Sequence, residues 1–293
     1  MMEDAPPQPM FLDVPTLLET SQPRPRVPWF WFIAGACLVL VVLGALSGAG
    51  SSVALQVGSW LLLTGLFLGM PLLLRHVVGQ VRAEQHAIEG ASELVQLRQY
   101  AQAGILLQQI LSQPSRTHPL RSQALIYLAA VLSRYHRFEE AISIQNHLID
   151  HNLVDPGTAY GLKLGRAMAM LREDHLFDAD RAISDLRRSG PSDSAGTALI
   201  EIYRDVKTGH PADAVRVFED KLLLLRDQLG HRLADAYALA ARAYDLLGQG
   251  PQAADAFRRA TLLSPLPELC RRYAEVEKLV GRYQPAPAPP ELA

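Results

Sequence analysis

Two small groups of residues have types and spacings that chemistry could use. His147 and His151 lie four residues apart with Asp150 beside them, and two imidazoles at that spacing on a helix can bind zinc. A further ligand is not evident, and the solvated end of a helix explains the same residues, so we expect no metal site. The paired acids Glu139–Glu140 and Glu173–Asp174 have no evident base or nucleophile as partner, and acids near a helix start complement its dipole.

Sequence motifs of common enzymes are missing. None of the lysines follows a glycine-rich turn, which excludes a P-loop; they are Lys163, Lys207, Lys221 and Lys278. The chain also lacks the G-x-S-x-G nucleophile elbow and the H-E-x-x-H zinc motif. We therefore expect no catalytic residues and no cofactor, although a fold alone does not forbid an enzyme.

The charge balance argues against nucleic acid as a partner. Of the 28 Lys and Arg residues, only Arg24 and Arg26 precede residue 75, and of the 30 Asp and Glu residues only four do. The region from Arg75 onward is therefore neutral and lacks the basic surface that phosphate backbones require. The two cysteines, Cys37 and Cys270, do not make a disulfide framework.

The elements that would position a site are clearest in residues 234–267. One face spaced i, i+3, i+4, i+7 consists of Tyr237, Ala240, Ala241 and Tyr244. Gly248, Gly250 and Pro251 then end this helix and begin another. The same spacing returns in Ala253, Ala256, Phe257 and Ala260. Two short helices with one apolar stripe each predict an antiparallel helical hairpin.

This stretch resembles a tetratricopeptide repeat (TPR). The family pattern of aromatic, small and proline positions falls at Tyr237, Ala240–Ala241, Tyr244, Ala253, Phe257 and Pro265. The chain departs from the pattern with Tyr237 in place of Trp and Ala240 in place of Leu. Because one hairpin cannot bury its own stripe, the resemblance implies several neighbouring hairpins.

Four weaker copies precede this hairpin, at intervals of about 34 to 39 residues against 34 in the family. Their first helices are expected from about residues 84, 122, 161 and 195, and their second helices begin near Tyr100, Phe138, Phe177 and Pro211. The second helix of the fourth copy should continue to Leu229, and one amphipathic helix over 268–280 should cap the array. The predicted fold is all-α, a TPR-like right-handed α-solenoid of about five hairpins with a C-terminal capping helix, over residues 76–283.

The resemblance implies a groove, lined by the first helices, that binds a segment of a partner protein. The residues projected onto it are Gln85, Ile88, Ser92, Gln96, Gln123, Ile126, Arg134, Arg172, Tyr203, Lys207, Asp235 and Arg242. Four of them, Arg134, Arg172, Lys207 and Arg242, would place a cation in successive repeats and could hold an acidic or extended segment. Solvated arginines that share this face by chance are the alternative. The carboxylate clamp of some family members is not expected, because Ile88 and Ser92 replace its Lys and Asn.

Residues 28–75 predict a two-helix transmembrane hairpin between a disordered polar arm (1–27) and the array, which a disordered Pro-rich tail (284–293) follows. Residues 29–74 contain no charged residue and no histidine, and 29–46 and 53–74 each approach the length of about 20 apolar residues that spans a bilayer. Gly44 with Gly48, and Gly65 with Gly69, form small-xxx-small patterns that could pack the spans together or make a homo-oligomer. Arginines flank the spans on one side only, so we expect both termini and the TPR region in the cytoplasm of a bacterium, with the chain integral to its cytoplasmic membrane.

Together these features predict a membrane-anchored TPR adaptor that is not an enzyme and binds a partner protein in its groove. The alternative is a structural or assembly subunit of a larger membrane complex, with the glycine-bearing spans as its contact surface. Crosslinking to a partner would distinguish the two.

Overall fold

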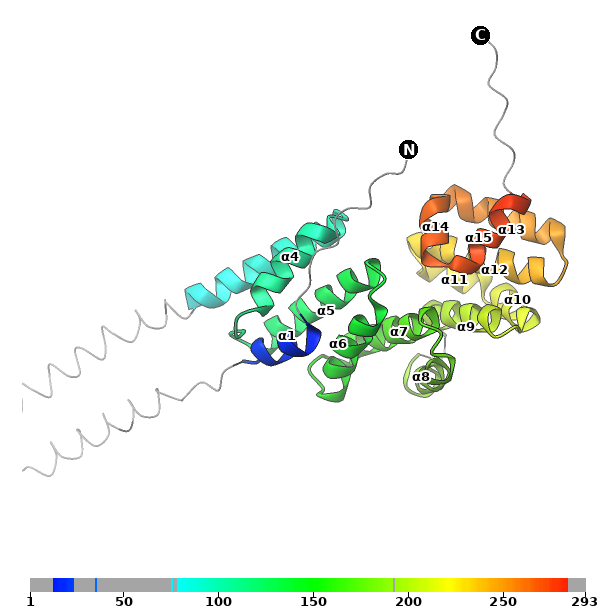
Figure 1. The fold of residues 1–293 in the computed structure, drawn as a ribbon. Helices are drawn as coiled ribbons and strands as arrows, with labels where there is room; N and C mark the ends of the chain where they lie inside the picture. The colour runs from blue at the N-terminus through cyan, green and yellow to red at the C-terminus, as the bar shows by residue number, and fades with distance from the viewer. Residues whose placement is uncertain (1–12, 24–34, 36–74, 76–77, 192, 284–293) are drawn as a thin grey trace, which may run out of the picture. The chain divides into compact units, whose positions relative to one another are not determined.

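The computed structural model describes residues 13–23, 35, 75, 78–191 and 193–283. Within these ranges the chain forms helices and turns and no strand (Figure 1). The prediction of an all-α chain is confirmed for this part of the sequence. The chain divides into two compact units, residues 1–131 and 132–293.

The first unit contains the first hairpin. A helical segment over residues 78–96 is followed by α4 (Tyr100–Leu111), and α5 (His118–Arg134) begins in this unit. Ile88 of the segment 78–96 and Leu107 of α4 are buried, as the spacing of apolar residues along both helices requires.

The second unit continues the succession of helix pairs. Its elements are α6 (Phe138–Asp150), α7 (Pro156–Arg172), α8 (Leu176–Ser189), α9 (Ala195–Lys207), α10 (Pro211–Asp220), α11 (Leu222–Gln228), η2 (Gly230–Arg232), α12 (Leu233–Leu246), α13 (Gly250–Leu263), α14 (Leu266–Arg272) and α15 (Ala274–Tyr283). Helix α7 packs on α8, α9 on α10, and α12 on α13. The first helices α7, α9 and α12 also pack on one another in sequence, as stacked hairpins must.

One kind of turn joins the two helices of each of five hairpins in the described ranges. Its central residue has a φ between 58° and 77°, and is Arg98, His136, Asp174, Gly209 or Gly248. The N–H of the next residue donates to the carbonyl five residues earlier at 2.8–3.0 Å, in the pairs Gln99–Leu94, Arg137–Leu132, His175–Met170, His210–Asp205 and Gln249–Tyr244. This is the Schellman ending of a helix, in which a left-handed residue satisfies a terminal carbonyl.

Small residues recur in register with these turns. The fifth residue after each left-handed position is a fully buried alanine, namely Ala103, Ala141, Ala179, Ala214 and Ala253. The seventh residue before it is Ala91, Ala129, Ala167, Ile202 or Ala241, each at most 1% exposed. In α7–α8 and α12–α13 alanine stands at both places, and these small side chains let the two backbones approach closely, whereas α9 has the larger Ile202. The predicted repeat of helical hairpins is therefore confirmed for the described residues.

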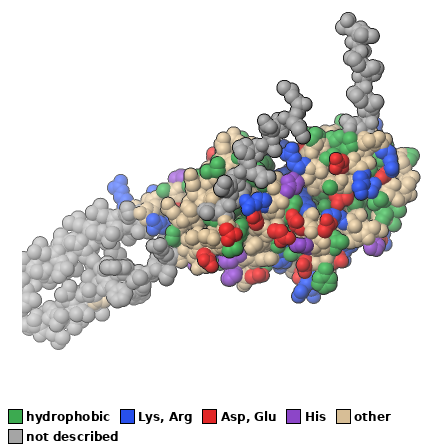
Figure 2. Space-filling model, in the orientation of Figure 1, with side chains coloured by type: hydrophobic (Ala, Val, Ile, Leu, Met, Phe, Trp, Pro, Cys, Tyr) green, Lys and Arg blue, Asp and Glu red, His purple; other side chains and the backbone are tan. Residues whose placement is uncertain are grey.

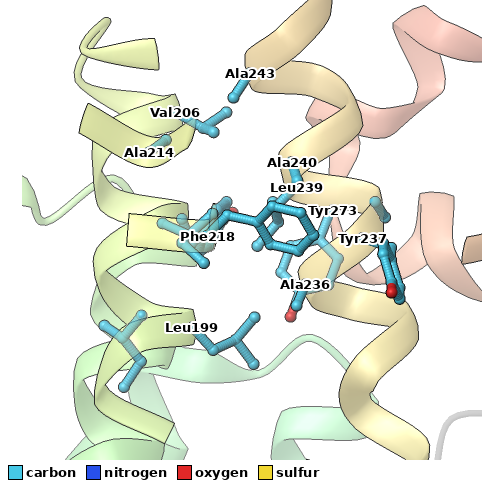
Figure 3. Close-up of a cluster of buried hydrophobic side chains, with 14 of the residues drawn as sticks. Leu199, Val206, Ala214, Phe218, Ala236, Tyr237, Leu239, Ala240, Ala243 and Tyr273 are labelled. Carbon is cyan, nitrogen blue, oxygen red and sulfur yellow. The ribbon is translucent and has the colours of Figure 1, made fainter. Parts of the chain in front are cut away.

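A continuous cluster of buried apolar side chains in the second unit extends from α7 to α15. In Figure 3, Phe218 of α10 points toward α12, where its ring meets that of Tyr237 edge to face at 5.5 Å. Gly196 allows α9 to lie close to α7, because a Cβ there would come within 2.9 Å of the side chain of Leu164. This close packing fixes the first helices relative to one another.

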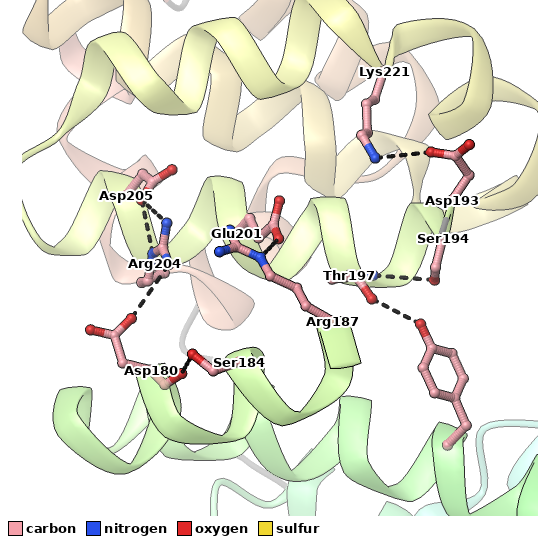
Figure 4. A network of polar contacts seen from close by, with 11 residues as sticks. Asp180, Ser184, Arg187, Asp193, Ser194, Thr197, Glu201, Arg204, Asp205 and Lys221 are labelled. Carbon is pink, nitrogen blue, oxygen red and sulfur yellow. Dashed lines mark hydrogen bonds and ion pairs between the residues drawn. The ribbon is translucent and has the colours of Figure 1, made fainter. Parts of the chain in front are cut away.

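Polar contacts hold α8 and α9 together at their surface (Figure 4). Arg204 of α9 pairs with its neighbour Asp205 at 2.7 Å and with Asp180 of α8 at 3.4 Å. Arg187 of α8 donates to Glu201 of α9 at 2.6 Å. Burial raises the pKa of Asp205 despite the opposing effect of Arg204. These pairs orient α9, which contributes two residues to the site described below.

The second helix of the fourth hairpin and the capping helix differ from the prediction. The former ends at Asp220, and α11 begins at Leu222 after Lys221 leaves helical geometry at φ −108° and ψ 12°. The capping helix is divided into α14 and α15 by Tyr273, whose backbone is extended at φ −139° and ψ 98°. The Tyr273 side chain is fully buried, and the extended backbone at this position lets it insert into the core.

The amino-terminal arm also differs from the prediction, because α1 (Val14–Thr20) is helical and packs on α4. Leu17 is 1% exposed, and the buried Arg121 holds the end of α1. Arg121 donates from Nε to Ser21 Oγ at 3.0 Å and from Nη2 to the Leu18 carbonyl at 2.7 Å. Burial of one short apolar face and these hydrogen bonds give α1 its structure.

The predicted localisation is corrected by the helices of the structure. A transmembrane helix needs about 20 predominantly apolar residues. No helix in residues 13–23, 35, 75, 78–191 or 193–283 has both the length and the apolar character for this. The prediction of an integral membrane protein with both termini in the cytoplasm is wrong on this finding, and we do not retain it. The predicted spans, with Gly44, Gly48, Gly65 and Gly69, lie outside the described residues, as does the tail 284–293.

Candidate protein-binding site

The predicted groove residues of the first unit are mostly at the surface. Gln85, Gln96 and Gln123 are exposed, Ser92 and Ile126 are half-buried, and Ile88 belongs to the core at 1% exposure. Gln85 donates from its side-chain amide to Glu89 at 2.9 Å. The structure therefore places Ile88 inside the hairpin and leaves the other five facing solvent in part or in full.

The four predicted cations do not all occupy equivalent positions. Arg134, Arg172 and Lys207 each lie two residues before the left-handed residue of their turn. Arg242 lies six residues before Gly248, one helical turn away from the equivalent position, which is Leu246. The series of equivalent cations thus ends at Lys207.

Four of the predicted residues come together in the second unit. They are Arg172 of α7, Tyr203 and Lys207 of α9, and Asp235 of α12. Because α7, α9 and α12 are the first (A) helices of their hairpins, we call these four residues the A-helix face. Tyr203 and Asp235 are 2% and 1% exposed, although both were predicted to line an open groove. The chain itself covers them, through residues 266–283, which comprise α14 and α15 and which we call the C-terminal segment.

Tyr273 is the central contact of the C-terminal segment with the A-helix face. Its ring lies edge to face with that of Tyr203, with 5.1 Å between centroids, and the Arg172 guanidinium lies 5.4 Å from its centroid. Its hydroxyl donates to Asp235 Oδ2 at 3.2 Å. Burial raises the pKa of Tyr273 and of Tyr203, so both hydroxyls remain protonated. Figure 3 shows Tyr273 beside α12.

Charged residues on either side of Tyr273 extend this contact. Arg272 donates from Nη1 to Asp235 Oδ1 at 2.5 Å and from Nη2 to Ser264 Oγ at 2.8 Å. Glu275 Oε1 lies 3.7 Å from Lys207 Nζ, which also donates to the Leu171 carbonyl at 2.6 Å. The cation, aromatic ring and anion of the segment thus contact, in the same order, an anion, an aromatic ring and a cation of the A-helix face.

The pairing is incomplete at two atoms. Arg172 Nε and Glu275 Oε2 are buried and have no hydrogen-bond partner among the described residues. Arg172 instead stacks between the rings of Phe138 and Tyr273, 5.3 Å and 5.4 Å from their centroids. Because a buried polar atom without a partner loses its hydration, these two atoms weaken the docking of the segment.

The far end of the C-terminal segment is held on α12. Asp245 accepts from the Tyr283 hydroxyl at 2.9 Å, pairs with Arg282, and accepts from Arg242 Nη1 at 2.6 Å. Burial alone would raise the pKa of Asp245, but these donors hold it below its ordinary value. Arg242, predicted as a groove cation, therefore stabilises the end of α12.

The other chemistry-bearing residues of the sequence have local roles. The rings of His147 and His151 lie 4.5 Å apart between centroids, and the described residues contain no group of three or more side chains suited to a metal. Glu140 pairs with Arg137 and Glu139 with His175, both at the start of a second helix. Asp174 pairs with Lys207 at 2.6 Å across neighbouring hairpins.

The described residues also contain an open pocket of about 690 Å³ beside α13. It is lined by Pro251, Ala254, Asp255, Phe257, Arg258, Thr261, Leu266 and Tyr283. The hydrogen bond from Arg258 lowers the pKa of Asp255, which also pairs with Arg259 at 2.8 Å. A carboxylate held ionised between two guanidinium groups is unsuited to donate or accept a proton in catalysis.

Surface charge shows no preference for one sign. On the face seen in Figure 2, basic and acidic side chains are interspersed. This agrees with the nearly equal numbers of Lys plus Arg and Asp plus Glu, 28 and 30.

No protein-family model matches the sequence, and no curated protein matches it. Among solved structures, the chain is similar to a thermophilic TPR protein of Thermus thermophilus. The two are 20% identical with a TM-score of 0.49, over 67% of this chain and 100% of the other.

Proposed function

We propose that this chain is a non-enzymatic scaffold that binds a segment of a partner protein on its A-helix face. One observation carries the proposal: the face already binds a protein segment, with Asp235, Tyr203 and Lys207 each meeting a side chain of matching chemistry. Aromatic rings and charge-assisted hydrogen bonds are the contacts that dominate recognition of protein segments. Enzyme action has no comparable support, since the acid in the described pocket is held by two arginines.

Selection of ligands from a displayed peptide library against the full chain tests this function. Lys207 and Lys221 form a matched pair of variants, because both are lysines in ion pairs but only Lys207 belongs to the A-helix face. Selected peptides should lose at least about tenfold in affinity for Lys207→Glu, which corresponds to one lost charge-assisted contact. The same peptides should bind Lys221→Glu as they bind the wild type. Equal binding to all three proteins would place the ligands elsewhere and contradict the proposed site.

A further inference from the structure

The C-terminal segment contacts the A-helix face in a way that defines a short sequence pattern. Arg272 and Tyr273 meet Asp235 and Tyr203, and Glu275 meets Lys207. Val276 and Leu279 follow on the buried side of α15 and are both fully buried. The pattern is thus a basic residue, an aromatic, any residue, an acid and an apolar residue, with a second apolar residue three positions later.

The construction of the C-terminal segment suits it to release. Ser264 and Pro265, where it leaves α13, have extended backbone conformations, and Pro267 follows in the first turn of α14. The contacts described between it and the helices α9 and α12 are made by side chains, as hydrogen bonds to α12 and an ion pair with Lys207 of α9, so its departure breaks none of the backbone bonds within those helices. Helices as short as α14 and α15 are marginal when undocked, so release would also unfold them.

The imperfect pairing points to competition. Arg172 Nε and Glu275 Oε2 are buried without partners while the segment is docked. A foreign segment of the same pattern that offers an acceptor to Arg172 Nε, or whose own acid has both oxygens paired, would bind the face better than the chain's own segment does. The A-helix face is therefore a filled site with room for a stronger occupant.

We propose that the C-terminal segment is an internal ligand of the A-helix face, and that the partner displaces it with an amphipathic helix carrying the same pattern of basic, aromatic, acidic and apolar residues. This inference rests on the proposed function and deepens it, since it names the chemistry of the partner. The apparent affinity of such a partner equals its intrinsic affinity for the open face multiplied by the fraction of chains in which the segment is undocked.

Binding of a synthetic peptide to the full chain tests the proposal. The peptide carries residues 266–283 with Cys270→Ser and a fluorescent label, and its anisotropy reports binding. Tyr273→Ala in the full chain weakens docking of the internal segment, so the peptide should bind this variant at least about tenfold more tightly than it binds the wild type. A peptide with alanine at the position of Tyr273 is the control and should bind neither protein.

A second pair of variants keeps the test decisive should Tyr273→Ala fail to fold. Glu275 is partly exposed, so Glu275→Lys removes the contact with Lys207 without opening the core. The wild-type peptide should bind this variant more tightly than it binds the wild-type chain. Equal affinity for wild type and variant, or no binding to a folded variant, would overturn the proposal. If the Glu275→Lys chain formed a dimer that excess peptide did not dissociate, the face would be occupied by a second copy of the chain. That result would also overturn the proposal.

The two proposals fail in different ways. Library peptides that depend on Lys207 but lack the pattern would leave the proposed function in place and remove only the internal-ligand inference. Absence of any Lys207-dependent ligand would remove the proposed function itself, whatever the C-terminal segment does.

Discussion

Tyr273 allows the docking of the C-terminal segment to be measured in energetic terms. Its side chain is fully buried, its ring contacts that of Tyr203, and its hydroxyl donates to Asp235. Tyr273→Phe keeps the ring and removes only the hydroxyl. Because Asp235 retains Arg272, the loss should fall at the low end for a hydrogen bond to a charged group, about 1.5 kcal/mol.

Tyr273→Ala also removes the ring. Truncation of a buried aromatic residue costs about 3–5 kcal/mol, of which the edge-to-face contact contributes about 0.5–1.5 kcal/mol. The free energy of unfolding, from urea denaturation followed by circular dichroism, should therefore separate the two variants by about 2 kcal/mol. Leu262→Ala is the control, because Leu262 is 79% exposed and its truncation should change little.

Two results would refute this reasoning. A loss below about 1 kcal/mol for Tyr273→Ala would mean that the tyrosine is not packed as described. Equal losses for the phenylalanine and alanine variants would mean that the ring contributes nothing beyond the hydroxyl.

Three further predictions concern the turns, the pH dependence and α1. Gly248→Ala should cost about 1–2 kcal/mol in unfolding free energy, because φ is 72° there, whereas Gly250→Ala, in helical geometry with open space around it, should cost nothing. Burial, Arg172 and Arg271 lower the pKa of His136 in the folded chain. Below about pH 6.5 the unfolded chain therefore binds more protons than the folded chain, and the free energy of unfolding should fall as the pH drops through that value. His136→Asn, which tolerates the positive φ, should flatten this slope in denaturation curves measured from pH 7 to 5. Arg121→Met should leave two hydrogen-bond acceptors of α1 unpaired and increase cleavage within residues 13–23 in limited proteolysis; unchanged cleavage would contradict its anchoring role.

The hairpins could be predicted because their signal is local. The spacing of Tyr237, Ala241 and Phe257 reports one apolar face per helix, and all three side chains are buried. The left-handed geometry of the turns at Arg98, His136 and Asp174 could not be predicted, since no glycine marks these positions.

The residues of the A-helix face could be predicted from the sequence, but the segment that covers them could not. Spacing along α7, α9 and α12 brings Arg172, Lys207 and Asp235 to one face, as predicted. What covers the face depends on contacts between residues 37 or 38 positions apart or more, such as Asp235 with Arg272 and Tyr273, which no helical period encodes. For the same reason α1, a short segment held by Arg121 at a distance of 100 residues, was predicted to be disordered.

Hydrogen exchange of the backbone amides of α15 and α12 tests most directly whether the A-helix face is a filled and releasable binding site. In the full chain, the amides of α15 should exchange through an opening that costs less free energy than global unfolding, while those of α12 should exchange only when the whole unit unfolds. Equal opening free energies for the two helices would contradict the account and make the C-terminal segment a fixed part of the core.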